Sequence, residues 1–209
     1  MKNKILSMLA AIAVAMTLSA CQAGDTGQMS PLSEAVTTVV EETAESIKMK
    51  TIEPPEDGWT IEQLNEFVYI NNQKITNPLR LSFLENMFEI EEITYLDSLK
   101  SASAVANIDD KYVFSVSFHY DLENKINKES SVKNIVFSSA LNQSEINNTY
   151  LVSINGVGLN THYDDMIERL GYPTEINDSM MSYVIDNQKL NFRLNNEKYI
   201  DFITLSWEE

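Results

Sequence analysis

The sequence predicts an α+β fold of two related modules, each with a short helix and an antiparallel β-sheet. Runs of alternating apolar and polar residues end in turn-forming Asn, Asp and Gly residues, which is typical of antiparallel strands. The segment Val-Tyr-Ile-Asn-Asn from Val68 matches Val-Ser-Ile-Asn-Gly from Val152, and a helical pattern and further strands follow each of them. The predicted modules span residues 59–140 and 141–209, and the sequence leaves open whether their strands share one sheet or pack as neighbours.

The first module is expected to open with a strand over residues 67–70 that leaves through a polar turn. A helix follows, with Asn77 as its N-cap and Pro78 in the first turn, where a missing N–H does no harm. Its apolar face is expected to hold Leu79, Phe83, Leu84 and Met87.

Strands complete this module after an acidic stretch whose structure the pattern leaves ambiguous. Residues 101–108 and 111–120 are predicted to form a hairpin that turns at Asp109 and Asp110. A further strand is predicted over residues 132–138.

The second module has clearer signals. A strand over residues 150–154 leads to a helix with Thr161 as its expected N-cap, two acids in the first turn, and Gly171 at its end. The helix carries a narrow apolar stripe of Tyr163, Met166, Ile167 and Leu170. A three-stranded meander is predicted over residues 181–185, 189–194 and 198–206.

The N-terminus has the layout of an export signal. Lys2 and Lys4 precede an apolar run over residues 5–18, and small residues then lead to Cys21, the single cysteine of the chain. A membrane-spanning helix needs about 20 apolar residues, so a retained transmembrane anchor is not expected. Residues 1–20 are predicted to be a signal peptide.

The tetrapeptide Leu18-Ser19-Ala20-Cys21 resembles the lipobox of bacterial lipoproteins. The resemblance implies that the Cys21 thiol receives a diacylglycerol and that the preceding peptide is removed. Two acyl chains meet the requirement for stable anchoring. Residues 21–58, rich in Ser, Thr, Glu, Pro and Ala, are predicted to be a lipidated flexible tether. An ordinary secretion signal with an incidental cysteine is the alternative.

Charge and cysteine usage restrict the partners. The net charge is −16, and it becomes −18 once residues 1–20, with two lysines and no acid, are removed. Such a field repels nucleic acid, so no nucleic-acid partner is expected. The charge is compatible with attraction of cationic peptides, proteins or metal ions, or with solubility alone. A single thiol permits no internal disulfide, so stability must come from an apolar core.

The run from Thr161 to Pro173 resembles the helix that precedes the strands in β-lactamase-inhibitor-protein-like domains and in the small lipoproteins that assist outer-membrane protein assembly. In those modules a Thr or Ser cap, an acidic residue and Leu-Gly-x-Pro introduce a three-stranded meander. The resemblance covers residues 155–207 and implies protein binding rather than catalysis. The first module matches poorly, and no inhibitory loop is carried over.

Residues suited to catalysis are sparse. His119 and His162 lie without paired Cys or His spacing, so no metal or cofactor site is predicted. The pairs Asp109-Asp110 and Asp164-Asp165 offer carboxylates for acid/base chemistry, but a hairpin turn and a helix start account for them locally. Gly156-Val157-Gly158 lacks the third glycine of a dinucleotide fingerprint and is interpreted as a turn. No catalytic residue is assigned.

Aromatic residues alternate within the predicted strands, as on a sheet face that covers a core, and an exposed binding face is the alternative. They are Tyr112, Phe114, Phe118, Tyr183, Phe192, Tyr199, Phe202 and Trp207. These features favour a non-enzymatic protein, lipid-anchored on the extracytoplasmic side of the cell membrane, whose sheet binds an unidentified protein or peptide. Two alternatives are a cell-wall hydrolase that uses Asp or Glu carboxylates, and a small-ligand binder with an apolar pocket between the modules.

Overall fold

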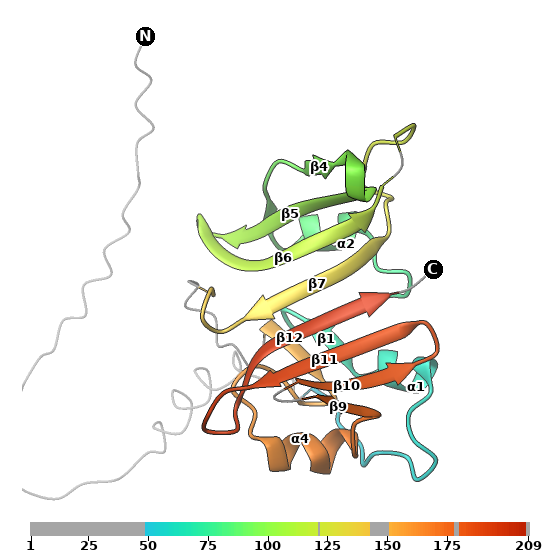
Figure 1. The fold of residues 1–209 in the computed structure, drawn as a ribbon, viewed down its shortest axis with the longest axis vertical. Helices are drawn as coiled ribbons and strands as arrows, with labels where there is room; N and C mark the ends of the chain where they lie inside the picture. Colours follow the sequence, from blue (N-terminus) through green and yellow to red (C-terminus); the bar gives the residue numbers. More distant parts are fainter. Residues whose placement is uncertain (1–48, 121, 143–150, 178–179, 208–209) are drawn as a thin grey trace, which may run out of the picture. The chain divides into compact units, whose positions relative to one another are not determined.

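The computed structural model describes residues 49–120, 122–142, 151–177 and 180–207. They belong to one compact unit, Ser46–Glu209. Antiparallel strands dominate and helices are few, which confirms the predicted α+β class (Figure 1). Cys21 and the predicted signal peptide lie outside the described residues.

A nine-stranded antiparallel sheet forms most of the unit, with the order β3-β5-β6-β7-β12-β11-β10-β9 and with β4 paired to β5. Strands from both predicted modules share this sheet, since β7 pairs with β12 at its middle. The strands are β3 (Glu89–Ile90), β4 (Thr94–Leu96), β5 (Ser101–Ile108), β6 (Lys111–His119), β7 (Val132–Ser138), β9 (Glu175–Asn177), β10 (Met180–Ile185), β11 (Gln188–Leu194) and β12 (Ile200–Trp207).

A second, small sheet has the order β2-β1-β8 and joins the beginnings of the two predicted modules. Its strands are β2 (Gln73–Lys74), β1 (Val68–Ile70) and β8 (Val152–Ile154). The helices are α1 (Ile61–Asn65), α2 (Leu81–Glu85), the 3-10 turn η1 (Asp97–Leu99) and α4 (Tyr163–Leu170).

One hydrophobic core joins the two layers. Phe114, Phe137 and Phe192 point from the large sheet, and they belong to the same buried cluster as Ile70 of the small sheet and Met166 of α4. Phe118, Tyr183 and Trp207 are buried too, so most of the strand aromatics form core. Tyr112 and Phe202 are half-buried, and Tyr199 is exposed.

The opposite face of the large sheet is polar at its centre. One cross-strand row, formed in register, consists of Ser115, Val136, Thr204, Asn191 and Ser182. Ser115, Val136 and Asn191 are half-buried between buried neighbours, as the period of two predicts, whereas Ser182 and Thr204 are buried themselves.

The two expected helix caps are wrong. The Asn77–Pro78 peptide is cis, and α2 begins later, with Arg80 at the N-cap position and no side-chain cap. The Thr161 hydroxyl accepts a hydrogen bond from Gly158 N–H, while His162 Nδ1 accepts one from Asp164 N–H and caps α4. The cap therefore sits one residue later than a preference for hydroxyl side chains indicates.

Helix α1 has no counterpart in the sequence expectations. Its Thr60 hydroxyl accepts from Gln63 N–H at 3.3 Å, and the Gln63 side chain accepts from Thr60 N–H at 3.0 Å. This reciprocal pair is a capping box, and the motif Thr-x-x-Gln was the signal that could have revealed it.

Candidate functional site

A cleft of about 470 Å³ opens beside β10. Three segments line it: residues 54–59, the end of α4 with the following turn to Thr174, and residues 183–185 of β10. Its volume lies within the range of ordinary ligand sites, about 300–1,000 Å³. Of the strand aromatics that the sequence singled out, Tyr183 lines this cleft, whereas the histidines and the Asp109-Asp110 and Asp164-Asp165 pairs do not line it.

One wall of the cleft is formed by residues 54–58, which belong to the segment 50–58 that we call the strap. Its position depends on Asn155, whose side chain is fully buried and whose φ of 49° is left-handed. Asn155 Oδ1 accepts from Ile52 N–H at 3.0 Å, and Asn155 Nδ2 donates to Ile52 O at 2.8 Å and to Arg169 O at 2.7 Å. A buried amide can make such paired bonds to a backbone because it carries both a donor and an acceptor.

The residue after Asn155 also contributes to this attachment. Gly156 has a φ of +81°, and its carbonyl accepts from Arg169 Nη1 at 2.8 Å. A Cβ at this position would collide with Arg169 Nη1 and lie 2.8 Å from Thr51 Cγ2. The positive φ therefore favours glycine, and a Cβ would displace the ends of the Arg169 and Thr51 side chains.

At the floor of the cleft, two aromatic side chains donate hydrogen bonds to backbone carbonyls at the C-terminal end of α4. Trp59 Nε1 donates to Leu170 O at 3.0 Å, and the Tyr183 hydroxyl donates to Gly171 O at 2.7 Å. Carbonyls at the end of a helix lack partners within the helix, so two aromatic side chains supply them here. Burial, with a smaller contribution from Tyr163, raises the pKa of Tyr183 well above its ordinary value, so this phenol stays a donor.

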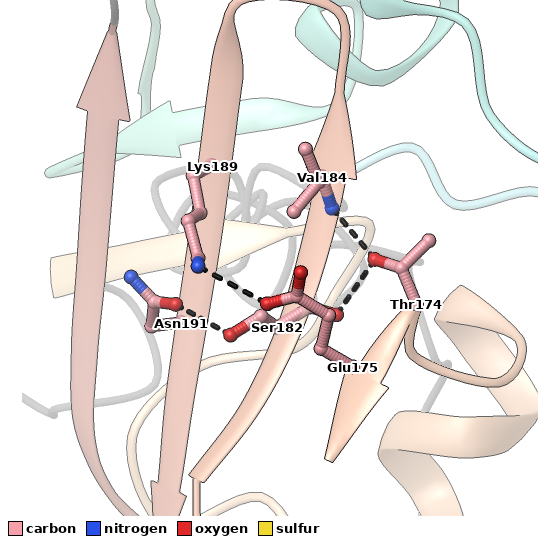
Figure 2. Close-up of polar contacts among 6 residues, drawn as sticks. All are labelled: Thr174, Glu175, Ser182, Val184, Lys189 and Asn191. Carbon is pink, nitrogen blue, oxygen red and sulfur yellow. Dashed lines mark hydrogen bonds and ion pairs between the residues drawn. The ribbon is translucent and has the colours of Figure 1, made fainter. Parts of the chain in front are cut away.

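A threonine side chain holds the rim of the cleft at the sheet edge (Figure 2). Thr174 Oγ1 accepts from Val184 N–H at 2.8 Å and donates to Ser182 O at 2.9 Å. The pairing between β9 and β10 ends at Ser182. Beyond that point, the Thr174 hydroxyl bonds the β10 backbone in place of a neighbouring strand. Lys189 Nζ lies 3.2 Å from Glu175 Oε2, and Figure 2 shows this ion pair beside the threonine.

Charge and exposure are uneven around the cleft. Glu56 and Asp57 are exposed on the strap side, and none of the lining residues is cationic. Tyr172 is 82 % exposed, and Val184 is 42 % exposed. The site therefore combines carboxylates, an accessible aromatic ring and a strand edge at which Thr174 bonds Val184 N–H and Ser182 O but not the Val184 carbonyl.

The carboxylate pairs singled out from the sequence lie on separate elements. Asp109 and Asp110 are exposed at the β5–β6 turn with φ values of 51° and 60°. Asp164 and Asp165 are exposed in the first turn of α4. Among the clefts lined by described residues, Asp109 borders one that neither Asp164 nor Asp165 reaches.

The histidines are also apart. His119 is exposed at the end of β6, whereas His162 caps α4 and packs edge-on against Tyr199. Within the part of the chain that the structure describes, no group of His, Cys, Asp and Glu side chains is arranged to hold a metal ion. The same part contains no helix long and apolar enough to cross a membrane.

Sequence reasoning missed the cleft because its walls come from distant parts of the chain. Ile52 and Asn155 are 103 positions apart, and Trp59 and Leu170 are 111 apart. The Asn155-Gly156 pair indicated only a turn, and nothing in its spacing predicted that the amide would bind a remote backbone. Comparisons with protein-family models, with curated proteins and with solved structures find no match to this chain.

Proposed function

We propose that this chain is a non-catalytic, lipid-anchored protein of the extracytoplasmic membrane face, and that it binds a protein or peptide segment in the cleft beside β10. The cleft carries the binding part of the proposal, because it joins an exposed aromatic ring, Tyr172, to a stretch of β10 that β9 leaves uncovered. The Leu-Ser-Ala-Cys sequence at Cys21 carries the anchoring part.

We also infer that residues 59–140 and 141–209 are related modules. Support comes from two antiparallel pairings that join them. β1 and β8 pair around Tyr69 and Ser153, so that the matching segments face each other in reversed order. β7 and β12, each the last strand of its module, pair at the middle of the large sheet. The resemblance to β-lactamase-inhibitor-protein-like modules fits this arrangement and the binding role.

No observation favours the two other functions. A hydrolase that uses carboxylate pairs needs two acids across one cleft, and Asp109 and Asp164 lie on separate elements. A small-ligand binder was expected to hold an apolar pocket between the modules. The cleft beside β10 is instead lined by the strap, Trp59 and residues of the second module.

Two measurements test the proposal. Mass analysis of the mature protein from its native membrane should find a diacylglyceryl-modified Cys21 at the N-terminus, and an unmodified thiol would refute the anchor. A photo-crosslinking amino acid in place of Tyr172, at the mouth of the cleft, should label a defined protein or peptide in cells. The same amino acid in place of exposed Tyr199 is the control. Equal labelling at both positions, or none, would refute binding at the cleft.

A further inference from the structure

We propose that the occupant of the cleft is an extended peptide segment that bears a lysine or arginine side chain. This inference rests on the proposed binding function and specifies its ligand class. Three features of the cleft carry it: its charge, its aromatic mouth and the exposed edge of β10.

The negative charge of the cleft favours a positively charged partner. Glu56 and Asp57 line the cleft, no lining residue is basic, and neither acid forms an ion pair within the described residues. Glu175, by contrast, already has a cationic partner in Lys189. A carboxylate pair beside a partly enclosed space attracts a cation more strongly than the same pair on a flat surface, because the cleft walls reduce screening.

The aromatic mouth suits an ammonium or guanidinium group. Tyr172 stands 82 % exposed at the cleft, so its ring face is available to a ligand. Cations bind favourably over aromatic faces within about 6 Å of the ring centre. The protein makes this type of contact elsewhere, where Arg193 lies 5.0 Å from the centre of the Phe202 ring.

The strand edge suits a peptide backbone. In an antiparallel strand the N–H and C=O of one residue point to the same side. Val184 N–H points toward Thr174, so the Val184 carbonyl points to the same side of β10. The Thr174 hydroxyl donates its own hydrogen bond to Ser182 O and not to Val184 O. β9 pairs with β10 only through Ser182, so an incoming N–H can bind Val184 O, the edge group that Thr174 leaves on this side. The volume of about 470 Å³ admits a short segment only.

The test uses the full mature chain with Cys21→Ser for solubility and Trp207→Phe, so that Trp59 in the cleft is the single tryptophan. Its fluorescence is titrated with an acetylated, amidated peptide of alternating valine and lysine. The comparison ligands are the glutamate analogue, the analogue with methylated backbone nitrogens, and cadaverine as a free diamine. Saturable binding of the lysine peptide alone is the expected result.

A matched pair of variants locates the charge effect. The double change Glu56→Gln and Asp57→Asn should weaken binding of the lysine peptide about fivefold, as expected for two exposed ion pairs. The control, Asp109→Asn with Asp110→Asn, removes the same charge at a distant turn whose left-handed residues tolerate Asn. Binding to the control should equal binding to the parent.

Several outcomes would overturn the inference: no saturable signal from the lysine peptide, equal weakening in the control, or equal binding of the methylated peptide or of cadaverine. These outcomes differ from failure of the proposed function. If crosslinking from position 172 still labels a specific partner while the lysine peptide does not bind, the cleft is a binding site for a different class of segment.

Discussion

The attachment of the strap depends on one buried side chain, and we predict that its removal is costly. Asn155 makes three side-chain hydrogen bonds, two to Ile52 and one to Arg169 O at the end of α4. Asn155→Gly removes all three and keeps the left-handed backbone without strain. Asn155→Ala also removes them and leaves, in a left-handed backbone, a residue that adopts this conformation less readily than Asn does.

The magnitude follows from these contacts. At about 1 kcal/mol of net stability for each hydrogen bond, Asn155→Gly should lower the free energy of unfolding by about 3 kcal/mol. The left-handed backbone adds about 1 kcal/mol for Asn155→Ala. Asn155→Asp should cost more than Asn155→Gly, because a buried carboxylate would face the carbonyl oxygens of Ile52 and Arg169 with no donor between them.

Urea unfolding of the three variants and the parent measures these differences. Hydrogen exchange on a peptide that contains Ile52 measures the strap by itself, because the Ile52 N–H is bonded to Asn155 Oδ1. Exchange of this amide should become fast in Asn155→Gly and Asn155→Ala, which lack the Oδ1 acceptor, while amides of central strand β7 should keep protection in proportion to the remaining global stability.

Two results would refute the reasoning. If Asn155→Gly changes the free energy of unfolding by less than about 0.5 kcal/mol, the three bonds do not stabilise the fold as inferred. If the Ile52 amide keeps the protection of the parent, Asn155 is not what holds the strap.

Three further predictions concern the same region. Tyr183→Phe should lower the free energy of unfolding by about 1 kcal/mol through loss of the 2.7 Å bond to Gly171 O. Because the raised pKa keeps the Tyr183 proton in the folded state while the unfolded chain releases it, parent stability should fall as pH rises above about 10. Absorbance titration and unfolding at alkaline pH should show this loss in the parent and less of it in Tyr183→Phe. Thr174→Val should speed exchange of the Val184 amide, which it bonds at 2.8 Å, and Thr174→Ser should not. Gly156→Ala should lower Tm by several degrees, since strain at φ +81° costs about 1 kcal/mol or more.

The sequence predicted the elements whose signals are local. The hairpin around Asp109 and the strand over residues 132–138 appear as β5, β6 and β7, because alternation and turn residues act within a few positions. Helix α4 ends at Leu170, as the apolar stripe and Gly171 predicted. These features need no knowledge of distant parts of the chain.

Other features depend on tertiary contacts, and the sequence did not predict them. The expected cap Asn77 fails because α2 begins where Leu81 N–H bonds Ser130 O, a partner about 50 residues away. The cleft needs the strap, which was assigned to a flexible tether over residues 21–58, and the strap needs the buried amide of Asn155. Composition reports that a segment is polar and rich in proline, but not that a distant side chain binds its backbone.

The route by which the chain enters the folded unit has a mechanical consequence. Tension that arrives along the chain ahead of Lys50 meets the amide pair at Ile52 before it reaches any strand of the large sheet. Those few bonds give way at lower load than the ladder between β7 and β12, and the residues released next, from Pro54 to Gly58, are one wall of the cleft. Rupture of the Asn155–Ile52 pair alone would release one wall of the cleft and leave every strand pairing of the large sheet in place.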